Sequence, residues 1–249
     1  MSGHSKWSTI KRKKGAIDAA RGKVFTKIIK EITVAARMGG GNADGNPRLR
    51  VALDKAKAAN MPKDTVDRAI KKGTGELEGV HYEEVTYEGY GAGGVAFYVE
   101  VTTDNKNRTA SEIRNIFTKA HGNLGASGSV AYMFHRKAVF VFDAKKLSED
   151  QILEVALEAG ADDVRSEDEQ VIVTASPDNF ENLKKAFEQK KFTYESGEIT
   201  RIPETTQHVT SDAAAQVLRL YQTLEESDDV DNVYANFDIE EQEMAKLME

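Results

Sequence analysis

Apolar residues in the first third of the chain recur at spacings of three and four, the period of an α-helix. These stripes predict three helices, over residues 17–39, 46–60 and 62–73. In the second, Asn46 stands at an N-cap position and Pro47 at the first helical position, where its missing N–H costs nothing. Glycines at 39–41 and at 73 end the first and third helices. Short helices with narrow apolar faces predict a small bundle, which with the arm before it spans residues 1–79.

From residue 80 the apolar positions alternate, as they do in strands. Tyr82–Glu88 and Val95–Thr103 are predicted strands, joined by a glycine-rich loop. A capping box at Thr109–Glu112 predicts the start of a helix, and Ser129–Phe134 is predicted as a third strand. This ββαβ unit is too small to be complete. The segment 203–240, with a strand, a helix and a strand, supplies what it lacks.

Residues 135–202 carry the element order βαββαβ, which is the ferredoxin-like plan. One of its helices is predicted to start at a capping box formed by Ser148 and Gln151. The sequence therefore predicts an α+β protein with three domains, a basic helical bundle and two α/β (ferredoxin-like) domains, one inserted into the other. The predicted ranges are 1–79, 80–134 plus 203–240, and the inserted 135–202, followed by an acidic tail at 241–249.

Charge is distributed unevenly along this chain. Residues 1–75 hold 18 of the 34 Lys and Arg residues and 6 of the 41 Asp and Glu residues, which leaves 16 basic and 35 acidic residues for the remainder. A basic segment attached to acidic domains indicates a module that binds a polyanion. The acidic domains would repel a nucleic acid, so it should approach the N-terminal face only.

The candidate nucleic-acid contacts are basic residues of the arm and of the polar sides of the first two helices. They are Lys6, Lys11, Arg12, Lys13, Lys14, Arg21, Lys23, Lys27, Lys30, Arg48, Arg50, Lys55 and Lys57. Such side chains neutralise phosphates, which positions a nucleic acid without selecting its sequence. An ordinary solvated surface is the alternative for any run of charges. The extent of this one, and its contrast with the acidic remainder, favour nucleic acid.

A polar loop at the start of a predicted helix is a second candidate site, because helix N-termini attract anions. Its candidate residues are Asn105, Asn107, Arg108 and Thr109. Asp and Asn also form turns and helix caps, so an anion or partner loop and plain cap chemistry both remain open.

Several functional classes find no support in the sequence. The chain has no cysteine, its five histidines are scattered, and it contains no nucleophile elbow and no Walker-type loop. We therefore predict no catalytic residue, no metal, no cofactor and no enzymatic activity. No apolar run is long enough to span a membrane, and no apolar segment follows the basic N-terminus, which favours a cytoplasmic protein without a membrane partner. The acidic domains could bind a protein partner.

Five segments, in this order, resemble the YebC/PmpR family. They are MSGHSKWSTIKRKKGAIDAARGKVFTKIIKEI, GNPRLRVALDKAKAANMPKDTVDRAIKKG, YEGYGAGG, TTDNKNRTASEIR and GNLGASGSVAYMF. The resemblance implies a helical bundle and two α/β domains, one inserted in the other, and it implies no agreed catalytic residues. Two positions depart from the family pattern: Ala92 stands where members commonly have Pro, and His121 where they commonly have Gly.

The resemblance also implies a function. Members are usually described as probable transcriptional regulators, which predicts a DNA-binding regulator whose basic N-terminal domain contacts phosphates. Mitochondrial relatives are translational activators, and a ribosome-associated role has been proposed for bacterial members. A translation factor that binds ribosomal RNA is therefore the alternative. A lysine-rich surface neutralises either backbone, so the sequence leaves both open.

Overall fold

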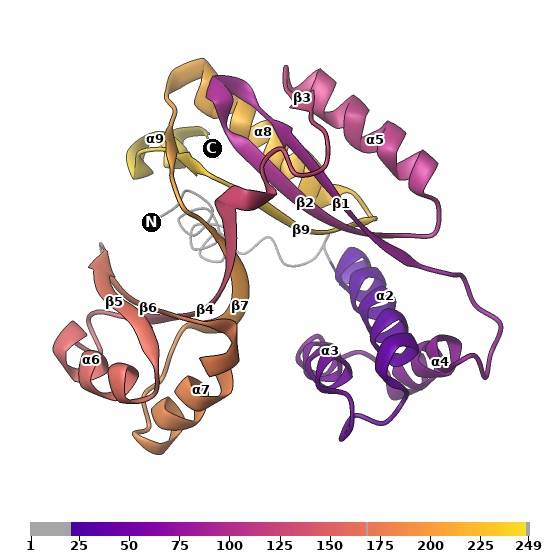
Figure 1. Ribbon diagram of the computed structural model, residues 1–249, viewed down its shortest axis with the longest axis horizontal. Helices are drawn as coiled ribbons and strands as arrows, with labels where there is room; N and C mark the ends of the chain where they lie inside the picture. Colours follow the sequence, from indigo (N-terminus) through magenta and orange to yellow (C-terminus); the bar gives the residue numbers. More distant parts are fainter. Residues whose placement is uncertain (1–20, 168, 248–249) are drawn as a thin grey trace. The chain divides into compact units, whose positions relative to one another are not determined.

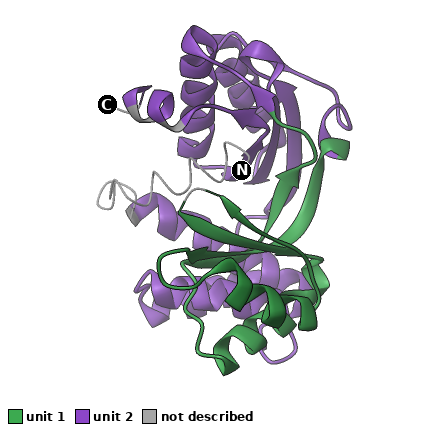
Figure 2. Cartoon of the chain, turned by 90° about the vertical axis from the view of Figure 1, so that its left-hand side faces the viewer, with its two compact units in different colours: residues 1–2, 132–206 green, residues 3–131, 207–249 purple. Residues whose placement is uncertain are grey.

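The computed structural model describes residues 21–167 and 169–247. These residues form two compact units, coloured separately in Figure 2. We call Tyr132–Thr206 the inserted unit, and residues 21–131 with 207–247 the composite unit. Helices and mostly antiparallel sheets occur together, so the chain has the predicted α+β, multidomain fold.

The composite unit begins with a bundle of three helices, α2 (Arg21–Gly39), α3 (Pro47–Ala58) and α4 (Lys63–Thr74). Their apolar faces meet around Ile32, Leu49 and Ala69, which are almost fully buried. The predicted start of α3 is confirmed, because the Asn46 side chain accepts a hydrogen bond from the Leu49 amide. Val24, an apolar residue of α2, is nevertheless 41% exposed. The predicted start of the first helix lies outside the described residues.

A four-stranded antiparallel sheet follows, in the order β3-β1-β2-β9. Its strands are β1 (Glu83–Tyr90), β2 (Ala96–Thr103), β3 (Asn123–Leu124) and β9 (Val230–Ala235). Helices α5 (Lys106–Lys119) and α8 (Ser211–Glu226) cover one face, and their apolar side chains share a core with β2 and β9 (Figure 1). Segments from both ends of the chain therefore build one sheet.

Smaller elements complete the composite unit. A 3₁₀ turn η1 (Ala92–Gly94) joins β1 to β2, and β8 (Gln207–His208) pairs in parallel with β10 (Phe237–Asp238). Helix α9 (Glu241–Leu247) follows. After α5, His121 adopts a φ of 56°, the left-handed region that favours glycine. The resemblance described above implies Gly at this position.

The inserted unit has the element order βαββαβ and the sheet order β5-β6-β4-β7, which is the ferredoxin-like arrangement. Its elements are β4 (Phe134–Asp143), α6 (Glu149–Glu158), β5 (Ala161–Glu167), β6 (Gln170–Ala175), η3 (Pro177–Asn179), α7 (Phe180–Gln189) and β7 (Ser196–Pro203). The core around Phe140, Phe142 and Phe187 lies between the sheet and the two helices. The predicted Ser148 capping box is confirmed.

Two predicted elements differ in the structure. Residues 129–134 are mostly not a strand: η2 (Ala131–Met133), a 3₁₀ turn, occupies most of them. The backbone amides of Val130 and Ala131 donate instead to the buried Glu88 carboxylate, which also accepts a hydrogen bond from the Gly128 amide. Helix α5 begins at Lys106 with Asn105 as N-cap, so the predicted Thr109–Glu112 capping box is wrong.

Candidate nucleic-acid interface

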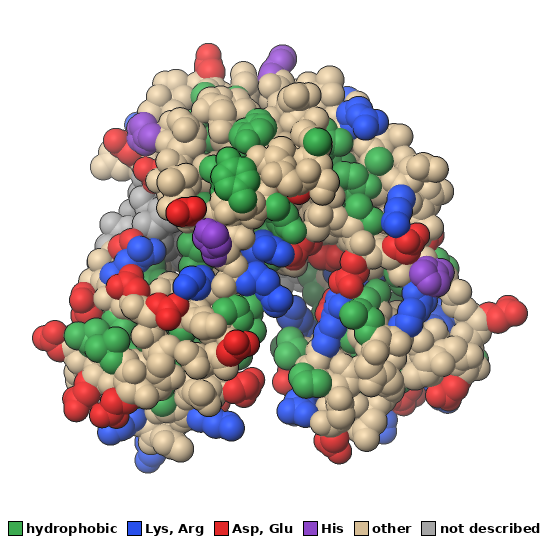
Figure 3. Space-filling view, in the orientation of Figure 1, with side chains coloured by type: hydrophobic (Ala, Val, Ile, Leu, Met, Phe, Trp, Pro, Cys, Tyr) green, Lys and Arg blue, Asp and Glu red, His purple; other side chains and the backbone are tan. Residues whose placement is uncertain are grey.

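The outward faces of α3 and α4 carry exposed basic side chains. Those of α3 are Arg50, Lys55 and Lys57, and those of α4 are Lys63, Arg68, Lys71 and Lys72. In Figure 3, Lys and Arg side chains reach the surface of the bundle alongside a few acidic ones. Within the described parts of the chain, none of these seven side chains takes part in an ion pair. Arg50 donates hydrogen bonds to the carbonyls of Ala43 and Asp44, which lie just before α3. Because all seven side chains are exposed, their charges can attract an external anion.

The basic residues of α2 are used differently. Lys23 and Lys27 donate hydrogen bonds to the backbone carbonyls of Glu226 (2.9 Å) and Glu225 (3.1 Å). These carbonyls lie in the last turn of α8, where the helix dipole presents partial negative charge. Lys30 lies on the same side of α2, because residues four and seven apart share a helix face. The cationic side of α2 therefore faces the α8 end of its own chain.

Lys30 is buried, with only 6% of its surface exposed. Its ammonium donates to Asp229 Oδ1 (2.7 Å) and to the carbonyls of Thr102 (3.1 Å) and Asp228 (2.9 Å). An ammonium with these three acceptors and no access to solvent cannot also contact a phosphate in this conformation. The phosphate contact predicted for Lys30 therefore stays a prediction, and it requires another conformation.

The carboxylate of Asp229, which lies between α8 and β9, contacts the loop that the sequence marked as a candidate anion site. Its Oδ2 accepts hydrogen bonds from Arg108 Nη2 (2.7 Å) and Thr109 Oγ1 (2.7 Å), at the N-terminus of α5. Burial alone would raise the pKa of this carboxyl, but hydrogen bonds from Lys30, Arg108 and Thr109 hold it well below its usual range. The anion at this loop is thus a carboxylate of the chain itself.

The remaining residues of that loop act locally. Asn105 accepts from the Arg108 amide as the N-cap of α5, so the cap interpretation holds for it. Asn107 is exposed, and its backbone carbonyl accepts from the Ser111 hydroxyl. These contacts of Asn105 and Asn107 therefore give no support to a second anion site at this loop.

Two arginines also join the bundle to β1 and to the segment just before it. Arg48 forms paired hydrogen bonds with Glu31 (2.9 and 3.0 Å) and with Glu84 (3.1 and 2.6 Å). These two carboxylates raise the pKa of Arg48, although partial burial opposes the shift. Arg37 donates to the carbonyls of Tyr82 (3.0 Å) and Val80 (3.3 Å). The charge of Arg48 is therefore used in contacts within the chain, although the side chain is partly exposed.

The structure thus separates the predicted basic residues by their surroundings. Arg50, Lys55 and Lys57 are exposed on α3, whereas Lys23, Lys27, Lys30 and Arg48 contact the rest of the composite unit. Lys6, Lys11, Arg12, Lys13, Lys14 and the side chain of Arg21 lie outside the described residues. The four exposed cations of α4 were not among the predicted contacts. Their positions on the polar side of the third predicted helix could have identified them.

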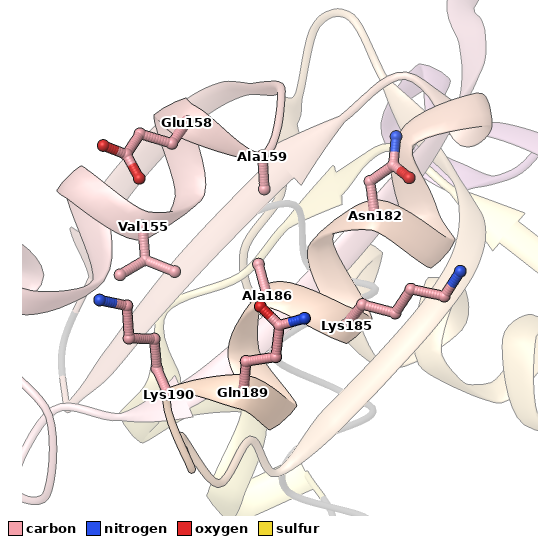
Figure 4. A pocket seen from close by; sticks show the side chains of 8 residues that line it. All are labelled: Val155, Glu158, Ala159, Asn182, Lys185, Ala186, Gln189 and Lys190. Carbon is pink, nitrogen blue, oxygen red and sulfur yellow. The ribbon is translucent and has the colours of Figure 1, made fainter.

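The inserted unit carries a groove of about 380 Å³ between α6 and α7. Figure 4 shows its lining: Val155 and Glu158 of α6 and Ala159 just after it face residues of α7 and its end, between positions 182 and 190. The polar groups there are Glu158, two amides and two lysines. This lining contains no Ser, Cys or His nucleophile and thus gives no support to a catalytic site.

Two further observations bear on partners. Among the described residues, no helix has both the length and the apolar character needed to cross a bilayer. In the same part of the chain, His, Asp and Glu side chains form no group that could hold a metal ion.

Two family models match the chain. Residues 5–76 match the N-terminal domain of TACO1/YebC proteins, and residues 82–237 match their second and third domains. Probable transcriptional regulatory proteins of Syntrophobacter fumaroxidans and of Geobacter sp. strain M21 are each 60% identical over 248 residues, which covers 99% and 100% of this chain and the whole of each relative. The crystal structure of a conserved hypothetical protein from Aquifex aeolicus is 50% identical, with a TM-score of 0.78 over 90% of this chain and 92% of that one.

Proposed function

The chain belongs to the TACO1/YebC family, and we propose that it is a non-enzymatic regulator of gene expression that binds DNA through its helical bundle. One observation carries this proposal: the outward faces of α3 and α4 present seven exposed cations that form no ion pair within the described residues, in an otherwise acidic chain. The name of the relatives, probable transcriptional regulatory protein, supports the regulatory part of the proposal.

The chemistry of these side chains defines what they would contact. Lysine ammonium groups, at the ends of flexible side chains, neutralise phosphates and release the condensed counterions. Nucleic-acid binding should therefore weaken steeply as the salt concentration rises. They position the protein on a duplex without reading its bases. The acidic domains would then face away from the nucleic acid, where a protein partner could bind them. We place this activity in the cytoplasm.

A charge-matched pair of variants tests the proposal. In the first, Lys55, Lys57, Lys71 and Lys72 become Gln. In the control, Lys184, Lys185, Lys190 and Lys191, on and just after α7 of the inserted unit, become Gln, so the net charge is identical. Binding of a fluorescent 30-base-pair duplex and of a structured RNA of similar length would be measured by anisotropy over a salt series.

We expect the bundle variant to bind the duplex at least about tenfold more weakly than the control, with a salt slope reduced by about 0.9 for each phosphate that it no longer neutralises. Equal affinities and slopes for both variants would contradict the proposal. Binding of the RNA with no measurable binding of the duplex would instead support the RNA-binding translation factor.

Crosslinking in cells then identifies the physiological ligand. Recovered DNA enriched at a few promoters supports the transcriptional role. Crosslinks confined to ribosomal RNA overturn it in favour of translation.

A further inference from the structure

We propose that the lysines of α2 form a releasable latch that holds the helical bundle against the α8 end of the composite unit, and that nucleic acid competes for these lysines. The latch consists of Lys23, Lys27, Lys30 and Asp229, together with the carbonyls of residues 225, 226 and 228. The competition rests on the proposed function, whereas the latch itself does not.

Polar contacts join the bundle to the sheet. The hydrophobic cluster of the bundle and that of the sheet with α5 and α8 have no residue in common. Ammonium groups on carbonyls and carboxylates join the two parts instead, along with the Arg37 and Arg48 contacts. Such contacts gain little net free energy over the hydration that they replace, so the docked arrangement can open without disrupting either core.

Asp229 has other hydrogen-bond donors besides Lys30. Its Oδ2 keeps the hydrogen bonds from Arg108 and Thr109, and Thr103 Oγ1 lies 3.2 Å away. These donors belong to β2 and α5, on the same side of the latch as Asp229. Opening therefore leaves no unpaired buried carboxylate, and the released ammonium returns to water. The principal cost of opening a buried ion pair is thereby reduced.

A nucleic-acid backbone offers the α2 lysines the same kind of acceptor that the latch does. Carbonyl oxygens at a helix C-terminus and a carboxylate are anionic or partly anionic oxygens, as are phosphate oxygens. Release would add three cations to the exposed set on α3 and α4. Because the ligand prefers the open form, nucleic acid and latch opening must favour each other.

The latch can be measured without nucleic acid. The chain contains no cysteine, so spin labels attach uniquely to Ala58→Cys on α3 and Asn115→Cys on α5, both of which are exposed. Electron–electron double resonance then reports the distance between bundle and sheet. Asp229→Asn removes the latch carboxylate, and Asp228→Asn is the matched control, since its side chain is exposed and only its carbonyl contacts Lys30.

We expect a narrow distance distribution for the parent and for Asp228→Asn, and a broader, longer one for Asp229→Asn. Lys30→Met removes the ammonium partner of Asp229 and should open the latch as well. It replaces Asp229→Asn in the experiment if that variant loses its cooperative unfolding transition. Distributions that stay unchanged in every folded variant would overturn the latch.

Duplex binding tests the competition. Asp229→Asn should bind the 30-base-pair duplex at least about fivefold more tightly than Asp228→Asn, which carries the same net charge. Lys30→Met should bind no more weakly than the parent, although Lys57→Met, which also removes one cation, should bind more weakly. Equal affinities of the two Asp variants, or a weakening for Lys30→Met as large as that for Lys57→Met, would overturn the competition. Failure of every protein to bind would overturn the proposed function and the competition with it, while the distances still decide the latch.

Discussion

Lys30 Nζ lies 2.7 Å from Asp229 Oδ1, and both side chains are less than a tenth exposed. The pair joins a helix of the bundle to the start of the last strand of the sheet, across 199 positions of sequence. A lysine in a basic amphipathic helix is thus buried in this structure. Basic helices cannot be assigned to phosphate binding from charge alone, because their cations also satisfy the chain's own carbonyls and carboxylates.

Asp231 should make stability depend on pH between about 4 and 7. Burial, with Glu31 nearby, raises the pKa of Asp231 to about 6, although a hydrogen bond from Thr102 opposes the shift. Because the folded protein then holds its proton more tightly than the unfolded chain does, the stabilisation is complete below pH 4 and is lost as pH rises through 6.

We therefore expect the free energy of unfolding of Asp231→Asn, relative to that of the parent, to rise by about 1–2 kcal/mol between pH 4 and pH 8. Partial exposure of the carboxylate makes this difference smaller than full burial would. Denaturant unfolding at a series of pH values measures the difference. Asp228→Asn, an exposed neighbour, is the control. A constant difference between parent and Asp231→Asn over this range would refute the prediction.

Glu88 should anchor the segment that leads into the inserted unit. Its buried carboxylate accepts three amide hydrogen bonds of 2.7–2.8 Å, from Gly128, Val130 and Ala131. In Glu88→Gln, the NH₂ group of the new side chain faces one of these backbone amides, so one hydrogen bond is lost. The free energy of unfolding should fall by about 1–3 kcal/mol at pH 7. Hydrogen exchange of residues 128–131 should accelerate in the same variant. Glu83→Gln, an exposed carboxylate of the same strand, should behave like the parent.

The Glu88 effect should also depend on pH. Burial raises the pKa of this carboxyl, but the three amide donors together hold it below the usual value. The advantage of Glu88 over Gln should therefore be complete above about pH 5 and shrink as pH falls below the ordinary glutamate pKa of about 4.3. An advantage that persists unchanged at pH 3 would contradict this account.

Gly73 should be required for the close approach of α4 to α2. A Cβ at this position would overlap the Thr33 carbonyl oxygen and lie 2.7 Å from Ala36 Cβ. Gly73→Ala should destabilise the bundle by about 1–3 kcal/mol, because backbone must move. Gly22→Ala, which has open space around the new Cβ, should be neutral or stabilising by up to about 1 kcal/mol. Thermal unfolding compares the two, and equal melting temperatures would count against the packing argument.

The N-terminal arm should add to the salt dependence of binding. Replacing Lys11, Arg12, Lys13 and Lys14 with Ala removes four cations that precede the described residues. Affinity for the 30-base-pair duplex should fall and the salt slope should flatten by up to about 0.9 for each phosphate left unneutralised, with stability nearly unchanged. If affinity and slope match those of the parent, the arm makes no phosphate contact.

Local chemistry in the sequence predicted much of the fold. Asn46 before Pro47 and Ser148 before Gln151 marked two helix starts that the structure confirms, because a cap is satisfied by amides only a few residues away. Alternation and helical period gave the ferredoxin-like order of residues 135–202 for the same reason. The failed capping box at Thr109 shows the limit. That hydroxyl belongs to a cluster around Asp229, 120 positions later in the chain.

The sequence by itself determined where helices and strands form, the contrast between a basic N-terminus and an acidic remainder, and the family to which the chain belongs. Only the tertiary structure decided which cations are exposed. Lys57 and Lys30 look alike in a sequence, but folding leaves one in water and buries the other against Asp229. Side-chain periodicity carries information over one or two helical turns, whereas an ion pair depends on which distant segment the fold brings into contact.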